Sequence, residues 1–281
     1  MFRRRLSYIL IFIGTLCLLS CGEQRSKEQV WAPSDFWNTD GYFQQDAVRT
    51  PSASEQVIRA RIRGKWQKFT LQDLPPEFMK WNTERRIETL DRFRQMAPPE
   101  LAGPHNGIVA SYGAKRFDTQ FKLNNAVKGM GFLPKPERLP EIIALLDSTK
   151  DASFQDKLDN LQYLYENAEE IFDLNKQVSL ELYSTPEFET QTFLNQMTNP
   201  ISTIVFLDIP SYKLKTIVRL LHPDDPHLTE YERNVVRYVN DVHSYFHGEF
   251  PRDYITAIYY VVEVYDNSPG SSDALGRRIA P

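Results

Sequence analysis

Residues 254–265 read Tyr-Ile-Thr-Ala-Ile-Tyr-Tyr-Val-Val-Glu-Val-Tyr, and their central part is apolar at consecutive positions. β-Branched and aromatic residues favour strands, and a strand that is apolar on both faces is typical of the covered centre of a sheet. Residues 201–209, with Ile204 to Leu207 at their centre, repeat this pattern. The two segments therefore predict a small mixed or antiparallel sheet whose central strands are buried on both faces.

Apolar residues at helical spacing predict amphipathic helices that cover this sheet. Ser153 and Asp156 form an acidic relative of a capping box, and the apolar stripe that follows predicts one long helix. Thr229 and Glu232 form a capping box before a helix that ends at Gly248. The order of elements indicates an α+β fold. The expected helices are residues 76–96, 139–146, 153–183 and 229–247.

The remaining segments predict one hairpin and one long connection. Alternating apolar and basic residues in 57–63, followed by Gly64-Lys65, predict a β-hairpin over residues 57–71. Residues 97–135 are rich in glycine and proline and predict a loop-rich segment. Binding residues are often carried by loops, so we expect contact surface in residues 97–135.

Composition and charge exclude several classes of protein. The chain has 281 residues, of which 41% are hydrophobic and 25% charged, which is typical of a globular protein. Two cysteines build no disulfide scaffold, and no paired Cys/His spacing for zinc is present. The formal net charge is −4, and an acidic chain is a poor general binder of nucleic acid.

The first 21 residues have the features of a targeting signal. Arg3, Arg4 and Arg5 precede a mostly apolar run of 14 residues, which is short for a membrane span and typical of a secretory signal. Leu18-Leu19-Ser20-Cys21 then resembles the lipobox of bacterial lipoproteins. The resemblance implies cleavage after residue 20 and acylation of Cys21. Loss of the three arginines, with no acidic residue in 1–20, would change the net charge from −4 to −7.

The same resemblance implies where the protein is located. Two or three acyl chains hold a protein firmly on a membrane. Gly22 stands where an Asp favours retention in the inner membrane of well-studied Gram-negative bacteria, so the expected location is the outer membrane of the cell envelope. Cleavage removes Cys17 and acylation consumes Cys21, which leaves no thiol for nucleophilic catalysis or metal binding.

The mature chain divides into a tether with an aromatic arm, residues 21–55, and a single globular α+β domain, residues 56–281. Packing of the arm across the globular body is the simpler interpretation, because large exposed apolar patches are rare. The alternative is a docking segment for a partner protein, since aromatic side chains anchor interfaces. The arm's aromatic residues are Trp31, Phe36, Trp37, Tyr42 and Phe43.

One group of residues suggests chemistry. His243 and His247 are one helical turn apart, and the loop before their helix holds His222, Asp224 and His227. Paired imidazoles at this spacing bind zinc in some proteases, although the glutamate of the protease motif is missing here. Structural interpretations also exist, because a histidine near a helix C-terminus interacts favourably with the helix dipole. Other catalytic templates, such as GxSxG or a Walker loop, are absent from the sequence.

The sequence therefore predicts a lipid-anchored envelope lipoprotein that binds or scaffolds another envelope protein and requires neither catalysis nor a cofactor. The alternative is a membrane-anchored hydrolase that holds a divalent metal with the histidine cluster of residues 222–247.

Overall fold

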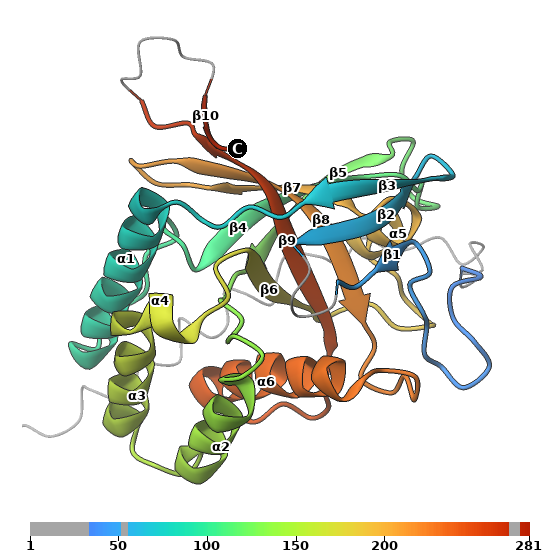
Figure 1. Ribbon diagram of the computed structural model, residues 1–281. Coiled ribbons are helices and arrows are strands. Elements are labelled where there is room, and N and C mark those ends of the chain that lie inside the picture. The colour runs from blue at the N-terminus through green and yellow to red at the C-terminus, as the bar shows by residue number, and fades with distance from the viewer. Residues whose placement is uncertain (1–33, 52–55, 270–275) are drawn as a thin grey trace, which may run out of the picture. The chain divides into compact units, whose positions relative to one another are not determined.

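The computed structural model describes residues 34–51, 56–269 and 276–281 (Figure 1). The predicted leader, Cys21 and Trp31 lie outside these ranges. Residues 33–281 form one compact unit, so the arm from residue 34 to 51 belongs to the same unit as the rest of the fold. The strands are β1 (Val48–Arg49), β2 (Val57–Ile62), β3 (Lys65–Thr70), β4 (Asn106–Tyr112), β5 (Leu123–Gly129), β6 (Lys176–Glu181), β7 (Ile201–Phe206), β8 (Tyr212–Leu221), β9 (Ile255–Asp266) and β10 (Arg277–Ala280). The helices are α1 (Pro76–Arg94), α2 (Leu139–Thr149), α3 (Phe154–Glu166), α4 (Ala168–Ile171), α5 (Gln191–Thr198) and α6 (Glu230–His247).

The main sheet is antiparallel and curls back on itself. Its strand order is β10-β9-β8-β7-β4-β5, and β6 pairs with the edge of β9 that β8 leaves free. The curl is closed by a bridge just after β5, where Gly131 N donates to Val178 O at 2.9 Å and Val178 N donates to Gly131 O at 2.8 Å. Strands β4, β5, β6, β9, β8 and β7 therefore form a continuous ring. The prediction of an α+β fold with a small antiparallel sheet is confirmed.

The most apolar strand occupies the centre of the fold, as predicted. Ile258, Tyr259, Tyr260 and Val261 of β9 are fully buried. Side chains on alternate positions of a strand point to opposite faces, so both faces of β9 are covered at this point. Helix α6 packs against β9 and β6, and α2 packs against α6 (Figure 1).

Local signals place several elements correctly. Residues 57–71 form the hairpin of β2 and β3, with Arg63 and Gly64 at positive φ in its turn. Both hydrogen bonds of the capping box at Thr229 are present at the start of α6, and Gly248 caps its C-terminus at φ 92°. The helices that start near residues 76 and 139 and the strand that starts at residue 201 are also present. Each of these elements is specified by residues next to it in the chain.

The prediction of one long helix over residues 153–183 is wrong. Ser153 does cap α3 through Asp156 N, but the backbone leaves the helix at Asn167, a short α4 follows, and residues 176–181 become β6. All six residues of β6 are buried and pair with β9. Pairing with β9 and burial on both faces outweigh the local helix preference of this segment.

The prediction of a loop-rich segment over residues 97–135 is also wrong in part, because this segment contains β4 and β5. Gly107 permits close packing on β4, since a Cβ there would lie 2.7 Å from Ile204 Cγ2 of the neighbouring strand. Gly131 takes part in the bridge that closes the ring. Two of the glycines that suggested a loop therefore serve close contact within the sheet.

Candidate functional site

The aromatic arm is used within the fold. Phe43 is 1% exposed, and the rings of Phe43 and Trp37 lie 5.1 and 5.3 Å from the ring of Phe193 on α5. Trp37 Nε1 donates to Glu189 Oε1 at 2.8 Å, and Phe36 also contacts Phe193 edge-on. These contacts are what the packing interpretation of the arm predicts.

The arm also encloses His222, which follows β8. The rings of Trp37 and Phe43 contact the imidazole edge-on, and Tyr42 lies beside it. His222 Nδ1 accepts a hydrogen bond from Asp224 N at 3.1 Å, so the neutral ring carries its proton on Nε2. Burial lowers the pKa of His222, against the opposing effect of the Asp224 and Asp225 carboxylates. His222 is therefore a neutral hydrogen-bond donor at neutral pH.

A polar cavity of about 230 Å³ adjoins this imidazole. It lies where the arm, the β8–α6 loop and the β6–α5 loop meet. Its buried carboxylate, Glu181, is already paired with Lys128 of β5. The lining therefore combines hydrogen-bond donors with the carboxylate of Asp224, which lies 3.9 Å from His222 Nδ1 and is exposed to solvent. It includes Trp37, Glu181, Ser184, His222, Asp224 and Arg252.

The structure divides the predicted histidine cluster into two groups. His222, Asp224 and His227 precede α6, whereas His243 and His247 lie in its last two turns. At 1.5 Å per residue, the helix separates the two groups by roughly 20 Å. Within the described ranges, no three His, Cys, Asp or Glu side chains are placed to share a metal ion. The five-residue metal site of the hydrolase alternative is therefore not formed by these side chains.

The two histidines of α6 lie in its last two turns, and His243 is hydrogen-bonded within the helix. His243 Nδ1 lies 2.8 Å from Val239 O, the carbonyl one turn earlier, to which it donates. The rings of His243 and His247 lie 6.4 Å apart. Burial lowers the pKa of both imidazoles. Their local environment thus favours the neutral form of both imidazoles.

A second candidate surface is an exposed apolar face of the main sheet, which the sequence analysis did not predict. The outward side of β4, β5 and β7 exposes large apolar side chains, with Tyr112 55%, Leu123 60% and Val127 68% exposed. Tyr112 pairs with Leu123, and Ile108 pairs with Val127, so these side chains share one face. We call the outward side chains of β5, β4 and β7 the uncovered sheet face. The sequence placed contact surface in residues 97–135, but on loops.

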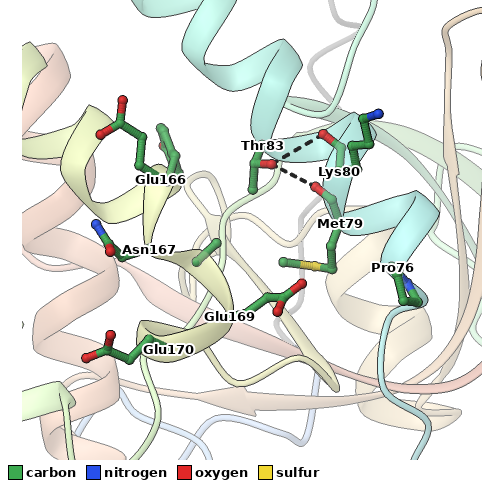
Figure 2. Close-up of a pocket in the computed structure, with 10 residues that line it drawn as sticks. Pro76, Met79, Lys80, Thr83, Glu166, Asn167, Glu169 and Glu170 are labelled. Carbon is green, nitrogen blue, oxygen red and sulfur yellow. Dashed lines mark hydrogen bonds between the residues drawn. The ribbon is translucent and has the colours of Figure 1, made fainter.

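A third feature is a groove of about 340 Å³ between α1 and the α3–α4 junction (Figure 2). Thr83, at its centre, donates to the carbonyls of Met79 and Lys80 in its own helix. In Figure 2 Glu169 points toward α1, whereas Glu166 and Glu170 point away. Acidic side chains on exposed helix surfaces are usually solvated, so we assign no binding role to this groove.

Comparison with known proteins provides no family. No family model matches the chain, and no curated protein matches it. One solved structure that matches is a protein related to general stress protein 26 of B. subtilis, of the pyridoxinephosphate oxidase family, from Clostridium acetobutylicum. The match has 11% identity and a TM-score of 0.29, and it covers 71% of this chain and 94% of that chain. Of the helices in the described ranges, none is both long and apolar enough to cross a bilayer.

Proposed function

We propose that the protein is a lipoprotein of the bacterial cell envelope, anchored by acylated Cys21 in the outer membrane, whose folded body binds another envelope protein. The observation that carries the binding role is the uncovered sheet face. Large apolar side chains that stay exposed on a rigid surface are typical of protein interaction sites.

The pattern of the uncovered sheet face supports this role. Val127, Ile108 and Val205 are neighbours across β5, β4 and β7, and the next position across the sheet is Lys213 on β8. Lys215, two residues further along β8, is paired with Glu263 of β9. The next row on the same face holds Asn125, Ala110 and Thr203, so apolar and polar side chains are mixed there, as is usual for a protein interface.

The anchoring role rests on the residues before the fold. The basic residues at 3–5, the short apolar run and Leu18-Leu19-Ser20-Cys21 together support lipid attachment. An acylated Cys21 would hold the body next to the membrane, where a scaffold meets its partners. No observation on the described residues favours the metal-dependent hydrolase.

Site-specific photocrosslinking tests the binding role. A benzophenone amino acid at Val127 should give a covalent product of one mass in native membranes, and the product should disappear when Leu123→Asp is added. The same amino acid at Glu84, an exposed polar position on α1, is the matched control. Equal crosslinking at positions 127 and 84, or a product that survives Leu123→Asp, would overturn the proposal.

Intact mass measurement tests the anchor separately. The protein from membranes should start at residue 21 and carry the added mass of acyl chains. Cys21→Ala should abolish both processing and acylation. Normal mass and membrane retention in that variant would refute the lipobox assignment.

A further inference from the structure

The connection between β4 and β5 differs in composition from the chain as a whole. Residues 112–123 read Tyr-Gly-Ala-Lys-Arg-Phe-Asp-Thr-Gln-Phe-Lys-Leu, which includes three basic residues and one acidic residue. The whole chain, in contrast, has a formal net charge of −4. We call residues 113–122 the β4–β5 loop. It lies within residues 97–135, for which the sequence predicts a contact surface.

Large apolar side chains of this loop and of its base are exposed. Phe121 is 74% exposed, and Phe117 is 47% exposed. Tyr112 and Leu123 form a cross-strand pair at the base of the loop and are 55% and 60% exposed. These rings and the leucine are therefore accessible at the surface, where the uncovered sheet face ends.

Two lysines of the loop have free charges. Lys115 and Lys122 are exposed, and their ammonium groups have no ion-pair partner among the described residues. Arg116, in contrast, is paired with Asp118, with Nε 2.7 Å from Oδ1. The loop therefore presents two uncompensated positive charges next to exposed aromatic rings. Aromatic and basic side chains together are typical of surfaces that contact anionic lipid headgroups.

The β4–β5 loop is held beside the start of the arm. Ser34 N donates to Glu189 Oε2 at 3.1 Å, and Arg116 Nη1 donates to Glu189 O at 3.4 Å. A second contact fixes the loop on α5, because Ala114 N donates to Asn195 Oδ1 at 2.8 Å. Ser34 and the loop thus lie at the same end of the folded body.

The length of chain before Ser34 places this end near the lipid anchor. Ser34 follows Cys21 by 13 residues, which span at most about 47 Å when fully extended. Acyl chains on Cys21 would therefore keep Ser34, and the loop beside it, within this distance of the bilayer. Because the connection limits how far this end can move away, its apolar and basic side chains meet lipid at a high local concentration.

We propose that the β4–β5 loop contacts the membrane that holds the lipid anchor. Phe121 enters the boundary between headgroups and acyl chains, and Lys115 and Lys122 lie against anionic headgroups. This inference rests on the lipid anchor of the proposed function and adds a second membrane contact, which orients the body. The part of the uncovered sheet face around Val127 stays available to a protein partner.

Fluorescence quenching on the full chain tests the proposal. The protein is reconstituted through its own acyl chains into vesicles of phosphatidylethanolamine and phosphatidylglycerol. A nitrobenzoxadiazole label is attached to Gln120→Cys, in the loop, or to Glu84→Cys, an exposed position on α1 that serves as the matched control. Lipids brominated high in the acyl chain should quench the label at position 120 several-fold more than the label at position 84. Equal quenching at the two positions would overturn the proposal.

Substitutions in the loop test which side chains make the contact. Phe121→Ser should lower the ratio of membrane-bound to unbound loop about tenfold or more, because a phenyl ring is lost from the lipid. Lys115→Gln combined with Lys122→Gln should lower it about tenfold or more in the anionic vesicles and leave it unchanged in phosphatidylcholine alone. The matched control is Phe154→Ser on α3, where the ring is 49% exposed. Wild-type quenching in both loop variants would refute the assignment.

Flotation of the same vesicles separates this inference from the proposed function. Every variant should float, because the acyl chains at Cys21 are unchanged. A wild-type protein that does not float would overturn the anchor and this inference with it. A wild-type protein that floats without quenching at position 120 would refute the loop contact alone. Crosslinking of position 120 to another protein, without quenching, would assign the loop to a protein partner and refute the lipid contact.

Discussion

The guanidinium of Arg86 on α1 is buried and hydrogen-bonded to the backbone, so its removal should measurably lower the free energy of unfolding. Arg86 is 2% exposed, and its Nη2 donates to two backbone carbonyls, Pro104 O at 3.0 Å and Met130 O at 2.7 Å. The group also lies over the rings of Phe132 and Tyr165. It therefore ties α1 to the loop before β4 and to the end of β5.

The expected effect of Arg86→Met follows from these contacts. Methionine keeps much of the apolar stem volume but leaves both carbonyls without this donor. A buried acceptor that loses its partner costs about 1–3 kcal/mol, so the two together predict a loss of about 2–6 kcal/mol in the free energy of unfolding. For a chain of this size, that corresponds to a fall of at least about 4 °C in the thermal midpoint.

Urea unfolding at pH 7.5, followed by circular dichroism, measures this loss. Arg92→Met is the matched control on the same helix, because Arg92 donates to Pro98 O at an exposed position where water can replace it. We expect the control to lose less than about 1 kcal/mol. If both variants lose the same free energy, the reasoning from burial is refuted.

Three further perturbations test the fold. Burial, and then the charge of Arg86, lowers the pKa of His105 in the folded protein to about 3, compared with about 6.5 in the unfolded chain. Neutral His105 therefore leaves the folded state at full stability above about pH 6.5, and the free energy of unfolding falls as the pH drops from 6.5 toward 3. His105→Gln should reduce the acid-induced loss of unfolding free energy between pH 6.5 and 4.5 by up to about 2.7 kcal/mol, measured by urea titration; an unchanged slope would contradict this. Gly107→Ala should lower the free energy of unfolding by about 1–3 kcal/mol, because the added Cβ would clash with Ile204. Gly129→Ala is the control and should be tolerated, because its Cβ would meet only an imidazole nitrogen at 3.8 Å. Equal thermal midpoints for the two variants would refute the packing reasoning. Thr229→Ala should lower the unfolding free energy by about 1 kcal/mol through loss of the capping box, and no change in a thermal melt would show that the cap is dispensable.

Much of the fold was predictable because its signals are local. The turn at Arg63-Gly64, the capping box at Thr229 and the Pro75-Pro76 helix start each act within a few residues of the chain. The apolar character of residues 254–265 predicts burial wherever the strand is placed. These signals keep their meaning without knowledge of the tertiary structure.

The errors have a common cause in contacts between distant residues. Val178 fits a helical stripe continued from α3, but Val178 and Leu180 together also fit one face of a strand, and pairing with β9 selects the strand. Gly107 reads as a loop residue until Ile204 packs against it. Strand β8 was not predicted, although it pairs along most of its length with β9.

The sequence by itself determined the α+β class, the capped helix at residues 230–247 and the resemblance of residues 18–21 to a lipobox, since each depends on neighbouring residues or on composition. Only the tertiary structure decided which distant residues meet. It separated His222 from His243 by the length of α6, placed Tyr112, Leu123 and Val127 on one sheet face, and brought the β4–β5 loop beside Ser34 at the start of the arm. The physical reason is that strand register and ring closure depend on pairings between remote segments, which a linear pattern of residues does not specify.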